Sequence, residues 1–441
     1  MNEFITDKQT LDDLNILGRY KTNSIFSLFN HTVTMGGSRL MEKMFQNPLT
    51  NAGYINHRSE IFSFFERIKV SLPFSGEEFE IVENYLRNAQ SRNRLMAIMN
   101  VTRIKLMNIL INDKEYLVLK RGLEQTIELL SRLKQLMAVI YKESVNTSYH
   151  DNAVKMNELL HRKYLDQAWL CTGQQPLSYK NVVKLDYVIR ALFNGQLNDL
   201  VMDIYEIDVY ITVSDVSRER KFIYAKAVEK EGKFIDLKGV YHPCIPGAVS
   251  NDVYIGEGKN VLFLTGANMA GKSTLMKSFG VAVYLCHMGF PVAAKQMFFS
   301  VHDGIYTSIN VPDNLAMGYS HFYAEVLRVK HVAQEVASGK QLLIIFDELF
   351  KGTNVKDAYD GTVAVVDAFS HRNGTYIIST HIMEAGETLR KMNDKIFFKY
   401  LPTVMEGHIP TYPYKLEDGI TDDHHGMIII KNEKIIEIIE S

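Results

Sequence analysis

The chain has 441 residues, which is long for a single hydrophobic core and indicates two or three domains. Its 49 basic and 51 acidic side chains leave a formal net charge of -2, so any nucleic-acid contact must come from a local patch. Three scattered cysteines indicate neither a disulfide framework nor a zinc knuckle, and no stretch has the roughly eighteen apolar residues of a membrane span. These features predict a soluble cytoplasmic protein with no membrane partner.

The first half of the chain has a helical pattern. From about Leu11 to Tyr210 apolar residues recur at spacings of three and four, as in YLVLKRGLEQTIELLSRLKQLMAVIY, residues 116–141. Near Lys221 the pattern changes to short β-prone runs broken by glycines, with prolines at positions 243 and 246. We therefore predict an all-α domain over residues 1–216.

The second half alternates between strand and helix patterns. Three apolar runs of strand length, NVLFLTG, KQLLIIFDE and GTYIISTH, each lead through polar residues into a helical pattern. This alternation predicts an α/β domain with a largely parallel sheet over residues 217–441. Its functional groups should lie at the carboxyl ends of the strands.

A glycine-rich segment follows the first of these runs. Gly266 to Ser273 reads G-x-x-x-x-G-K-S between VLFL and the helical STLMKSFGVAVYL, which is the Walker A spacing in its expected context. The glycines let backbone N–H groups and the helix N-terminus point at phosphates, while Lys272 reaches the β and γ oxygens and Ser273 ligates Mg²⁺. ATP and Mg²⁺ are the predicted cofactors. The predicted nucleotide-binding residues of this loop are Gly266, Ala267, Asn268, Met269, Ala270, Gly271, Lys272, Ser273 and Thr274.

Two carboxylates end the second run, LLIIFDE. Because buried carboxylates are costly unless they are paired or bound to metal, Asp347 is predicted to hold Mg²⁺ together with Ser273, and Glu348 to polarise the water that attacks the γ-phosphate. His381 ends the run TYIISTH. A lone histidine is more often structural, but the order of motifs favours a hydrogen bond from His381 to the γ-phosphate. Lys272, Glu348 and His381 are the predicted catalytic residues.

A serine lies directly before the amphipathic helix of HFYAEVLRVKHVAQEV. In that position Ser320 is ordinarily an N-cap. An exposed helix N-terminus also offers N–H groups to an anion, so contact of Ser320 with the γ-phosphate held by a second subunit is the competing interpretation.

Taken together, these motifs resemble those of the DNA mismatch-repair MutS family, within the ABC ATPase superfamily. TGANMAGKST resembles the family's TGPNMxGKST with Ala267 in place of proline, and DELFKGTNVKDAYDG resembles DEIGRGTSTYDG with Lys351 in place of arginine and three extra residues. Ser320, Phe322 and Glu325 resemble the STFxxE signature, and YKLEDGITDDHHG resembles the late YxLxxGxxxxxxG stretch. The resemblance implies an ABC-type ATPase domain that hydrolyses ATP to ADP and phosphate.

The resemblance extends to the amino terminus. DKQTLDDLNI, SIFSLFNHTVTMGGSRLMEKMFQNPLT and INHRSEI resemble the start of the family's helical core or lever domain. The mismatch-reading and connector domains would lie before Thr10, where this sequence has no room for them. We therefore expect a minimal member with a core/lever domain and an ATPase domain.

Two functions remain open at this stage. In the first, the chain is a homodimeric DNA clamp joined through its ATPase domains, with mismatch binding implied by the family alone. In the second, the same ATPase is coupled to a protein or to non-mismatch nucleic acid. The segment from Asn84 to Asn112 has no acidic residue and is the predicted DNA contact, although a solvated helix face is an equally good interpretation of it. Its basic residues are Arg87, Arg92, Arg94, Arg103 and Lys105.

Overall fold

The computed structural model describes residues 3–18, 23–87, 94–173, 176–192, 194–229, 234–256, 258–309, 321–406, 409–422 and 438–439. It divides the chain into two compact units. Unit 1 contains Met1–Leu28, Met44–Ser59 and Glu219–Ser441, and unit 2 contains Phe29–Lys43 and Glu60–Arg218. In the described part of the chain, no helix is both long enough and apolar enough to cross a membrane.

This division differs from the predicted boundary between residues 216 and 217 in two amino-terminal segments, which belong to unit 1. Ile5 forms a parallel bridge with Gly304, and the Thr307 hydroxyl donates to the Asp13 carboxylate at 2.8 Å. The Tyr284 hydroxyl donates to the Phe45 carbonyl at 2.6 Å. These segments are helical in pattern, but their polar partners lie more than 200 residues away in the sequence. The local pattern therefore assigned them to the neighbouring helical domain.

Unit 1 is an α/β unit built on a six-stranded sheet of order β12-β9-β4-β8-β7-β6. All its neighbouring strands are parallel except for the edge strand β12, which is antiparallel to β9. The predicted largely parallel sheet is therefore confirmed. The strands of this sheet are β4 (Val261–Gly266), β6 (Gly304–Ser308), β7 (Leu342–Asp347), β8 (Gly374–Ser379), β9 (Ile396–Leu401) and β12 (Glu417–Asp418).

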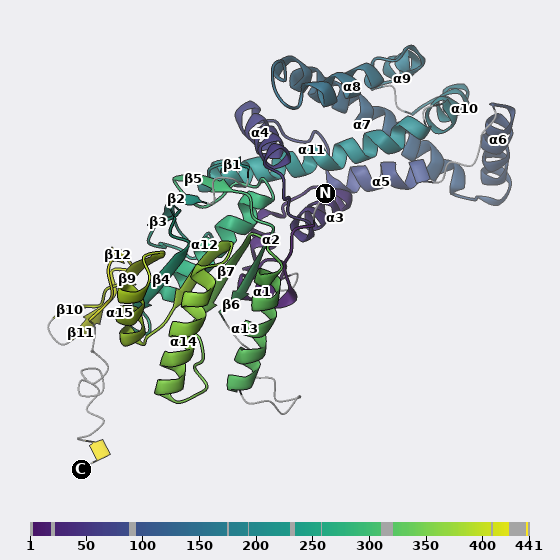
Figure 1. Cartoon of the computed structure of the whole chain (residues 1–441). Helices are drawn as coiled ribbons and strands as arrows, with labels where there is room; N and C mark the ends of the chain where they lie inside the picture. Colours follow the sequence, from purple (N-terminus) through teal and green to yellow (C-terminus); the bar gives the residue numbers. More distant parts are fainter. Residues whose placement is uncertain are drawn as a thin grey trace. The chain divides into compact units, whose positions relative to one another are not determined.

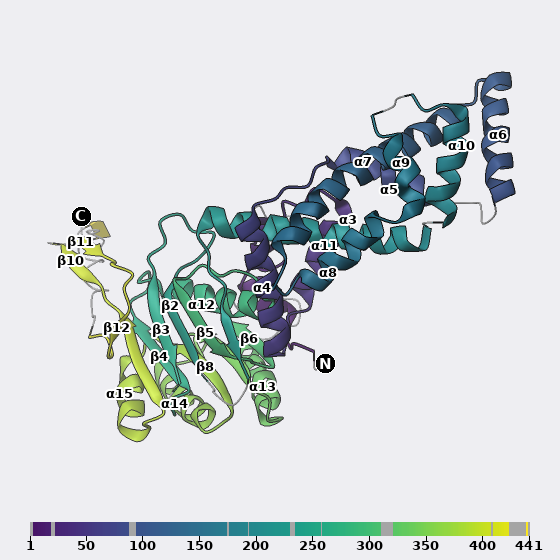
Figure 2. The same ribbon diagram turned by 90° about the horizontal axis from the view of Figure 1, so that it is seen from above.

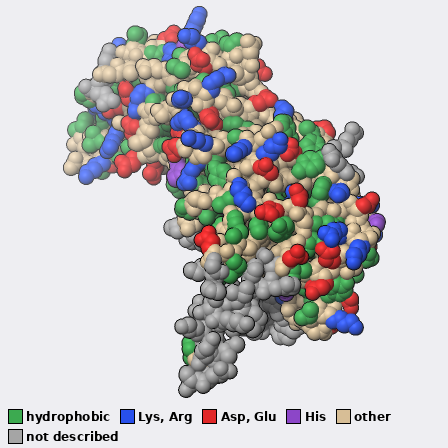
Figure 3. Space-filling view, turned by 90° about the vertical axis from the view of Figure 1, so that its left-hand side faces the viewer, with side chains coloured by type: hydrophobic (Ala, Val, Ile, Leu, Met, Phe, Trp, Pro, Cys, Tyr) green, Lys and Arg blue, Asp and Glu red, His purple; other side chains and the backbone are tan. Residues whose placement is uncertain are grey.

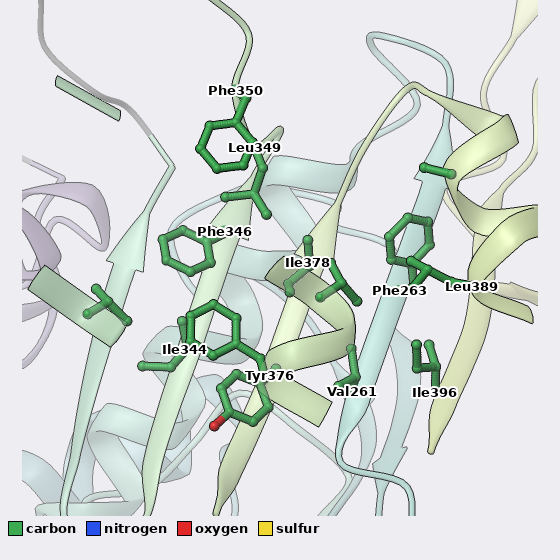
Figure 4. Packing of buried hydrophobic residues seen from close by; sticks show 14 of the residues in the cluster. Val261, Phe263, Ile344, Phe346, Leu349, Phe350, Tyr376, Ile378, Leu389 and Ile396 are labelled. Atoms are coloured by element: carbon green, nitrogen blue, oxygen red, sulfur yellow. The ribbon is translucent and has the colours of Figure 1, made fainter. Parts of the chain in front are cut away.

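Helices cover both faces of this sheet (Figure 1). Alternate residues of the strands, such as Val261, Phe263, Ile344 and Phe346, join one core cluster with side chains from three of the helices (Figure 4). These three helices are α13 (His321–Ala337), α14 (Val355–Ser370) and α15 (Met383–Met392). Helix α12 (Lys272–His287) covers the other face and is buried on nearly every side. The strands read as continuous apolar runs because both of their faces are covered.

A smaller sheet and several short elements complete unit 1. The second sheet has the order β1-β5-β2-β3 and is mixed, with β1 parallel to β5 and the other pairs antiparallel. Figure 2 shows it beside the larger sheet. The remaining elements are α1 (Lys8–Asp13), α2 (Ile25–Phe29), β1 (Lys226–Val228), β2 (Ile235–Val240), β3 (Asn251–Ile255), β5 (Gln296–Ser300), β10 (Val404–Glu406) and β11 (Ile409–Thr411).

Unit 2 is all-α, as the sequence predicts. Its longest helix, α7, buries Leu123, Ile127, Leu130 and Met137 at spacings of three, four and seven, which form one stripe toward the neighbouring helices. Gly122 lets α7 approach α5 closely, since a Cβ there would lie 2.8 Å from the Cβ of Tyr85. The helices are α3 (Met35–Gln46), α4 (Ala52–Ile68), α5 (Gly76–Arg87), α6 (Arg94–Ile111), α7 (Glu115–Glu143), α8 (His150–Leu160), α9 (Asp166–Leu170), α10 (Tyr179–Tyr187) and α11 (Asn194–Arg220), with short turns η1 (Lys163–Leu165) and η2 (Val188–Leu192). The end of α3 from Met44 and the start of α4 up to Ser59 belong to unit 1.

Buried polar groups also fix unit 2. The Asp208 carboxylate accepts hydrogen bonds from the backbone N–H groups of Val33 and Thr34, at 3.0 and 2.7 Å, and from the Thr34 hydroxyl at 2.7 Å. It thereby caps the turn that leads into α3. Asp186 accepts from the Tyr85 hydroxyl at 2.8 Å and lies 2.9 Å from the Arg190 guanidinium. On the face of the molecule in Figure 3, basic and acidic side chains are interspersed.

Candidate nucleotide site

The glycine-rich loop lies between the middle of the sheet and a buried helix. Strand β4 ends at Gly266 and α12 begins at Lys272, so the loop's N–H groups and the helix N-terminus lie together. Gly266 and Gly271 have φ values of 145° and 99°, in the region that favours glycine. A Cβ on Gly266 would lie 2.9 Å from the Leu401 carbonyl oxygen. The loop thus has the conformation that a phosphate-binding turn requires.

Lys272 is held by this loop. Its side chain is 5 % exposed, and Nζ donates to the carbonyl oxygens of Gly266 at 2.7 Å and Ala267 at 3.2 Å. Burial lowers the pKa of this ammonium group, while the nearby carboxylates of Glu348 and Asp347 oppose that shift. A phosphate oxygen would offer the ammonium group a stronger, charged partner than the two carbonyls.

The order of the strands brings the glycine-rich loop and the carboxylates after β7 together at the carboxyl ends of the parallel strands. Strand β8 pairs with both β4 and β7, and Asp347 is in register with Ser379 at their carboxyl ends. The Asp347 carboxylate accepts from the Ser379 hydroxyl at 2.5 Å and also from the Ser273 hydroxyl. The structure therefore places the two predicted Mg²⁺ ligands, Ser273 and Asp347, in contact. Hydroxyl and carboxylate oxygens are the donors that Mg²⁺ prefers, and it usually completes its shell with water and phosphate, so these residues fit the ion.

Glu348 lies among three basic side chains. Its carboxylate oxygens are 3.3 Å from Lys351 Nζ, 3.8 Å from His381 Nδ1 and 4.0 Å from Lys272 Nζ. The neighbouring His381, together with the two lysines, lowers the pKa of Glu348 to about 2 despite its partial burial. Its backbone has φ 58°, a left-handed value that costs a non-glycine residue about 1–2 kcal/mol. This carboxylate is thus held ionised in a strained turn beside the loop, which is the setting expected of a functional group.

His381 follows β8 and contacts Glu348 from the neighbouring strand end. Its side chain is 57 % exposed, so it is not a buried structural histidine. The five predicted residues therefore lie together at the carboxyl ends of the inner strands. They are Lys272, Ser273, Asp347, Glu348 and His381.

A cavity of about 520 Å³ adjoins the loop. One wall contains Asn268, Met269, Gly271 to Thr274 and Glu348, and the other contains His242, Ile245 to Val249 and Tyr414. Asn251 holds the Tyr414 segment, because its amide donates to the Tyr414 carbonyl at 2.9 Å and accepts from the Leu416 N–H at 2.8 Å. The apolar and aromatic second wall has room for a flat organic group next to the phosphate loop.

Sequence reasoning missed this second wall. In the sequence, the prolines at positions 243 and 246 mark a change of pattern and YKLEDG carries a family resemblance, but neither indicates a role at the site. Asn251 and Tyr414 are separated by 163 residues, so no local pattern connects them. The available signal was composition, because prolines and a glycine between two β-prone runs mark a loop that a rigid sheet can position.

A smaller cavity of about 250 Å³ lies beside the end of β7 and is lined by Ser308, Glu325 and residues 346–351. The start of α13 approaches it, and the rings of Phe322 and Phe350 lie 6.2 Å apart. Gly352 permits this approach, since a Cβ there would lie 2.6 Å from the Phe322 nitrogen. Ser320 lies outside the described residues, so its contact with a second subunit's phosphate stays a prediction.

The predicted DNA-contacting segment has a different environment. Arg92 and the side chain of Arg94 lie outside the described part of the chain. Arg87 lies 3.9 Å from Glu83, the Arg103 guanidinium donates to Asn100 at 3.4 Å, and the Lys105 ammonium lies 4.0 Å from the centre of the Tyr179 ring. Each of these three cations therefore has a neighbour within unit 2.

The strand, glycine-rich loop and helix, with two carboxylates on a neighbouring parallel strand, define a P-loop domain of the α/β class. Comparison with known proteins extends this assignment. Residues 262–440 match the family model for MutS domain V. This match covers the part of the chain that contains the loop, both carboxylates and His381, and it supports a relationship to the MutS family.

Several curated relatives resemble about half of the chain. A DNA mismatch repair protein MutS of Lactococcus lactis subsp. cremoris (strain MG1363) is 30 % identical over 244 residues, which is 54 % of this chain and 29 % of the relative. Proteins of the same name from Brevibacillus brevis and Halalkalibacterium halodurans are 29 % and 28 % identical over 240 and 264 residues. These two matches cover 53 % and 57 % of this chain, but 27 % and 30 % of the relatives. The shared region is thus less than a third of each relative's length.

Proposed function

We propose that the chain binds ATP with Mg²⁺ and hydrolyses it to ADP and phosphate. The observation that carries this proposal is the convergence of Ser273, Asp347 and Glu348 beside the loop that holds Lys272. The cavity of about 520 Å³ next to the loop accommodates the rest of the nucleotide. Mg²⁺, when bound by Ser273 and Asp347, supplies positive charge to the phosphate oxygens.

The protein side chains have separate roles in the proposed reaction. Lys272 exchanges its two carbonyl partners for phosphate oxygens and so orients the β and γ phosphates. Glu348, held ionised, accepts a hydrogen bond from the attacking water and aligns it with the γ-phosphate. His381 lies 3.8 Å from Glu348 and, in this proposal, donates a hydrogen bond to the γ-phosphate. The reaction is thus promoted by positioning and by fixed charges.

We further infer that the ATPase acts on DNA as a homodimer joined through its ATPase domains. Support comes from the relatives, which are named DNA mismatch repair proteins, and from the exposed setting of His381, which suits a site completed by a second subunit. Mismatch sensing has no residue assigned to it in this chain. The alternative is an ATPase directed to a protein or to other nucleic acid, and the described cations of the segment Arg87 to Lys105 favour it because each already has a neighbour.

Steady-state ATP hydrolysis with and without DNA distinguishes these functions. The assay should compare homoduplex, single-mismatch and branched DNA at two salt concentrations. Stimulation that falls with salt is expected of a DNA-dependent clamp, because phosphate contacts release counterions. Hydrolysis that ignores every DNA would favour the protein-directed alternative. Absence of hydrolysis under all conditions would contradict the ATPase assignment itself.

A further inference from the structure

Helix α6 has apolar residues on two opposite sides. Its inner side packs on α7 and α10 and buries Ala97, Val101 and Ile104, each at most 3 % exposed. The Thr102 hydroxyl lies 2.6 Å from the Tyr179 hydroxyl of α10 and fixes the rotation of the helix. Figures 1 and 2 both show α6 at the edge of unit 2.

The outer side carries a set of large apolar residues that we call the apolar stripe. Its members are between 39 % and 74 % exposed. At about 100° per residue they lie within an arc of about 120°. Arg103 is the one charged residue among the described positions of this arc. The stripe consists of Leu95, Met96, Met99, Leu106, Met107 and Leu110.

The exposed area of the stripe is large for a monomer. Its six side chains together expose on the order of 700 Å², above the upper end of the roughly 300–600 Å² of the largest apolar patch on a typical monomer. Two such stripes facing each other would bury about 1,400 Å², which lies within the range of specific protein–protein interfaces. A helix whose inner side already fills a core has no folding reason to carry this outer surface.

We propose that the stripe is an interface between two copies of this chain, in which α6 packs antiparallel on α6 of the partner about a two-fold axis between Thr102 and Arg103. Four of the six members of the stripe are placed symmetrically about this midpoint, since Leu95 and Leu110 are equally distant from it, as are Met99 and Leu106. An isologous contact requires a surface that complements itself in this way. Antiparallel packing also aligns opposite ends of the two helix dipoles.

Other occupants fit the residues less well. A DNA-binding face requires several cations, and Arg103 is the one that this arc provides. A helix lying in a membrane interface exposes a basic face to water, but the opposite side of α6 is packed against α7 and α10. The interface proposed here is separate from dimerisation through the ATPase domains and does not depend on nucleotide.

Sedimentation velocity of the nucleotide-free full chain over a range of concentrations tests the proposal. The wild type should associate reversibly, and Met99→Glu should weaken the association at least tenfold. Arg103→Leu should strengthen it about threefold or more, because it removes a charge from the middle of the apolar surface. Leu170→Glu is the matched control, since Leu170 is 73 % exposed on α9 of the same unit but lies outside the stripe, and it should leave the association unchanged.

Repeating the measurement in a Lys272→Ala background separates this contact from a nucleotide-dependent dimer. Association that persists there and still responds to Met99→Glu supports the stripe whether or not the chain is an ATPase. A chain that remains monomeric at every concentration, or that associates equally well with Met99→Glu, overturns the proposal.

Cysteine cross-linking tests the antiparallel register, with Cys171→Ser and Cys244→Ser removing the two partly exposed native thiols. In the proposed pairing, Leu95 of one copy lies beside Leu110 of the other, whereas the two Leu95 positions are about 22 Å apart at 1.5 Å per residue. A mixture of Leu95→Cys and Leu110→Cys chains should therefore form a mixed disulfide, and Leu95→Cys alone should not. Self-linking of Leu95→Cys alone would overturn the antiparallel arrangement.

Two binding assays test whether the apolar stripe instead contacts a membrane or duplex DNA. If the chain does not self-associate but floats with vesicles of phosphatidylglycerol and phosphatidylcholine, and Met99→Glu abolishes flotation, the stripe is a membrane contact and the proposal is wrong. If Arg103→Leu leaves the chain monomeric and weakens binding to duplex DNA, the segment is a DNA contact and the proposal is equally wrong.

Discussion

The nucleotide site at the carboxyl ends of the strands and the outer side of α6 are unusual in opposite ways: the first buries charged groups, and the second exposes apolar groups. At the sheet edge, charged groups such as Lys272 and Glu348 are largely withdrawn from water and hold one another in place. On α6, apolar groups such as Met99 and Leu110 are exposed. Burying charged groups costs free energy, and exposing apolar groups forgoes the stabilisation that burial would give. Each arrangement therefore indicates that a ligand or a partner surface binds there. The chemistry of the displaced residues then indicates which kind of partner is missing: an anion at the first site and an apolar surface at the second.

The largest effect on ATP hydrolysis is expected from removing the carboxylate that aligns the attacking water. Glu348→Gln keeps the size of the side chain and removes the charge that accepts the water's hydrogen bond, so kcat for ATP hydrolysis should fall about 10²–10³-fold with ATP affinity retained. Single-turnover hydrolysis and equilibrium ATP binding measure the two quantities. Glu335→Gln, on the surface of α13, serves as the control and should hydrolyse at the wild-type rate. Normal turnover of Glu348→Gln would remove Glu348 from the catalytic role.

Removing the loop lysine should act on nucleotide binding. Lys272→Ala deletes a charged partner of the phosphates, and ATP affinity should fall about 30–100-fold, in keeping with about 2–3 kcal/mol for a charge-assisted contact. Isothermal titration measures it, with Lys340→Ala as the control, because Lys340 is a partly exposed lysine after α13 that pairs with Glu335. Unchanged affinity would mean that the two loop carbonyls are the functional partners of Lys272 and that the phosphates are bound elsewhere.

The sequence was sufficient for the first site because its chemistry is local. The glycine spacing fixed the loop, and three apolar runs ending in polar residues located β4, β7 and β8 with their functional ends. The convergence of Asp347 with Ser273 also depends on strand order, which parallel connections constrain but short motifs do not encode. The wall formed by Tyr414 and the assignment of the segment around Asp13 to unit 1 rest on contacts across more than 150 residues, which no window of sequence contains.

For α6 the sequence was ambiguous for a different reason. Apolar residues lie on both sides of this helix, so the pattern predicts a helix without saying which side is buried. Val101 and Met99 are similar in hydrophobicity, yet one is fully buried and the other largely exposed. The basic residues of the segment suggested DNA, whereas the structure gives Lys105 the Tyr179 ring as a neighbour. Only tertiary packing distinguishes the two sides.

A substitution in unit 2 tests a buried carboxylate that has no catalytic role. Asp208→Ala deprives two backbone N–H groups and the Thr34 hydroxyl of their acceptor, so the free energy of unfolding should fall by about 2–4 kcal/mol. Denaturant unfolding monitors it, and ATP affinity should not change in the folded protein. Asp215→Ala, on the more exposed part of α11, is the control and should lose less than about 1 kcal/mol. Equal losses in both variants would mean that Asp208 is not a structural cap.

The pH dependence of stability tests the charges around Glu348. Its pKa is lowered from 4.5 to about 2, so its ionised form stabilises the fold fully above about pH 4.5, and this contribution is lost as the pH falls toward 2. The difference in Tm between the wild type and Glu348→Gln should therefore be constant from pH 7 to 5 and should shift to the disadvantage of the wild type between pH 4.5 and 2. A difference that is constant down to pH 2.5 would mean that the basic neighbours do not act on this carboxylate.

The smallest effect is expected at Lys351, whose ammonium group is the nearest cation to Glu348 but is 40 % exposed. Water screens an ion pair of this kind, so it contributes little to stability, and its main consequence is to restrain the direction of the Glu348 carboxylate. Lys351→Met should therefore lower kcat about three- to tenfold without changing the unfolding midpoint. Lys351→Arg should restore most of the rate, because a guanidinium group offers the carboxylate the same charge. If Lys351→Met and Lys351→Arg hydrolyse ATP equally slowly, the side chain acts through its shape at the turn after β7, and charge restraint of Glu348 is assigned to His381 and Lys272 alone.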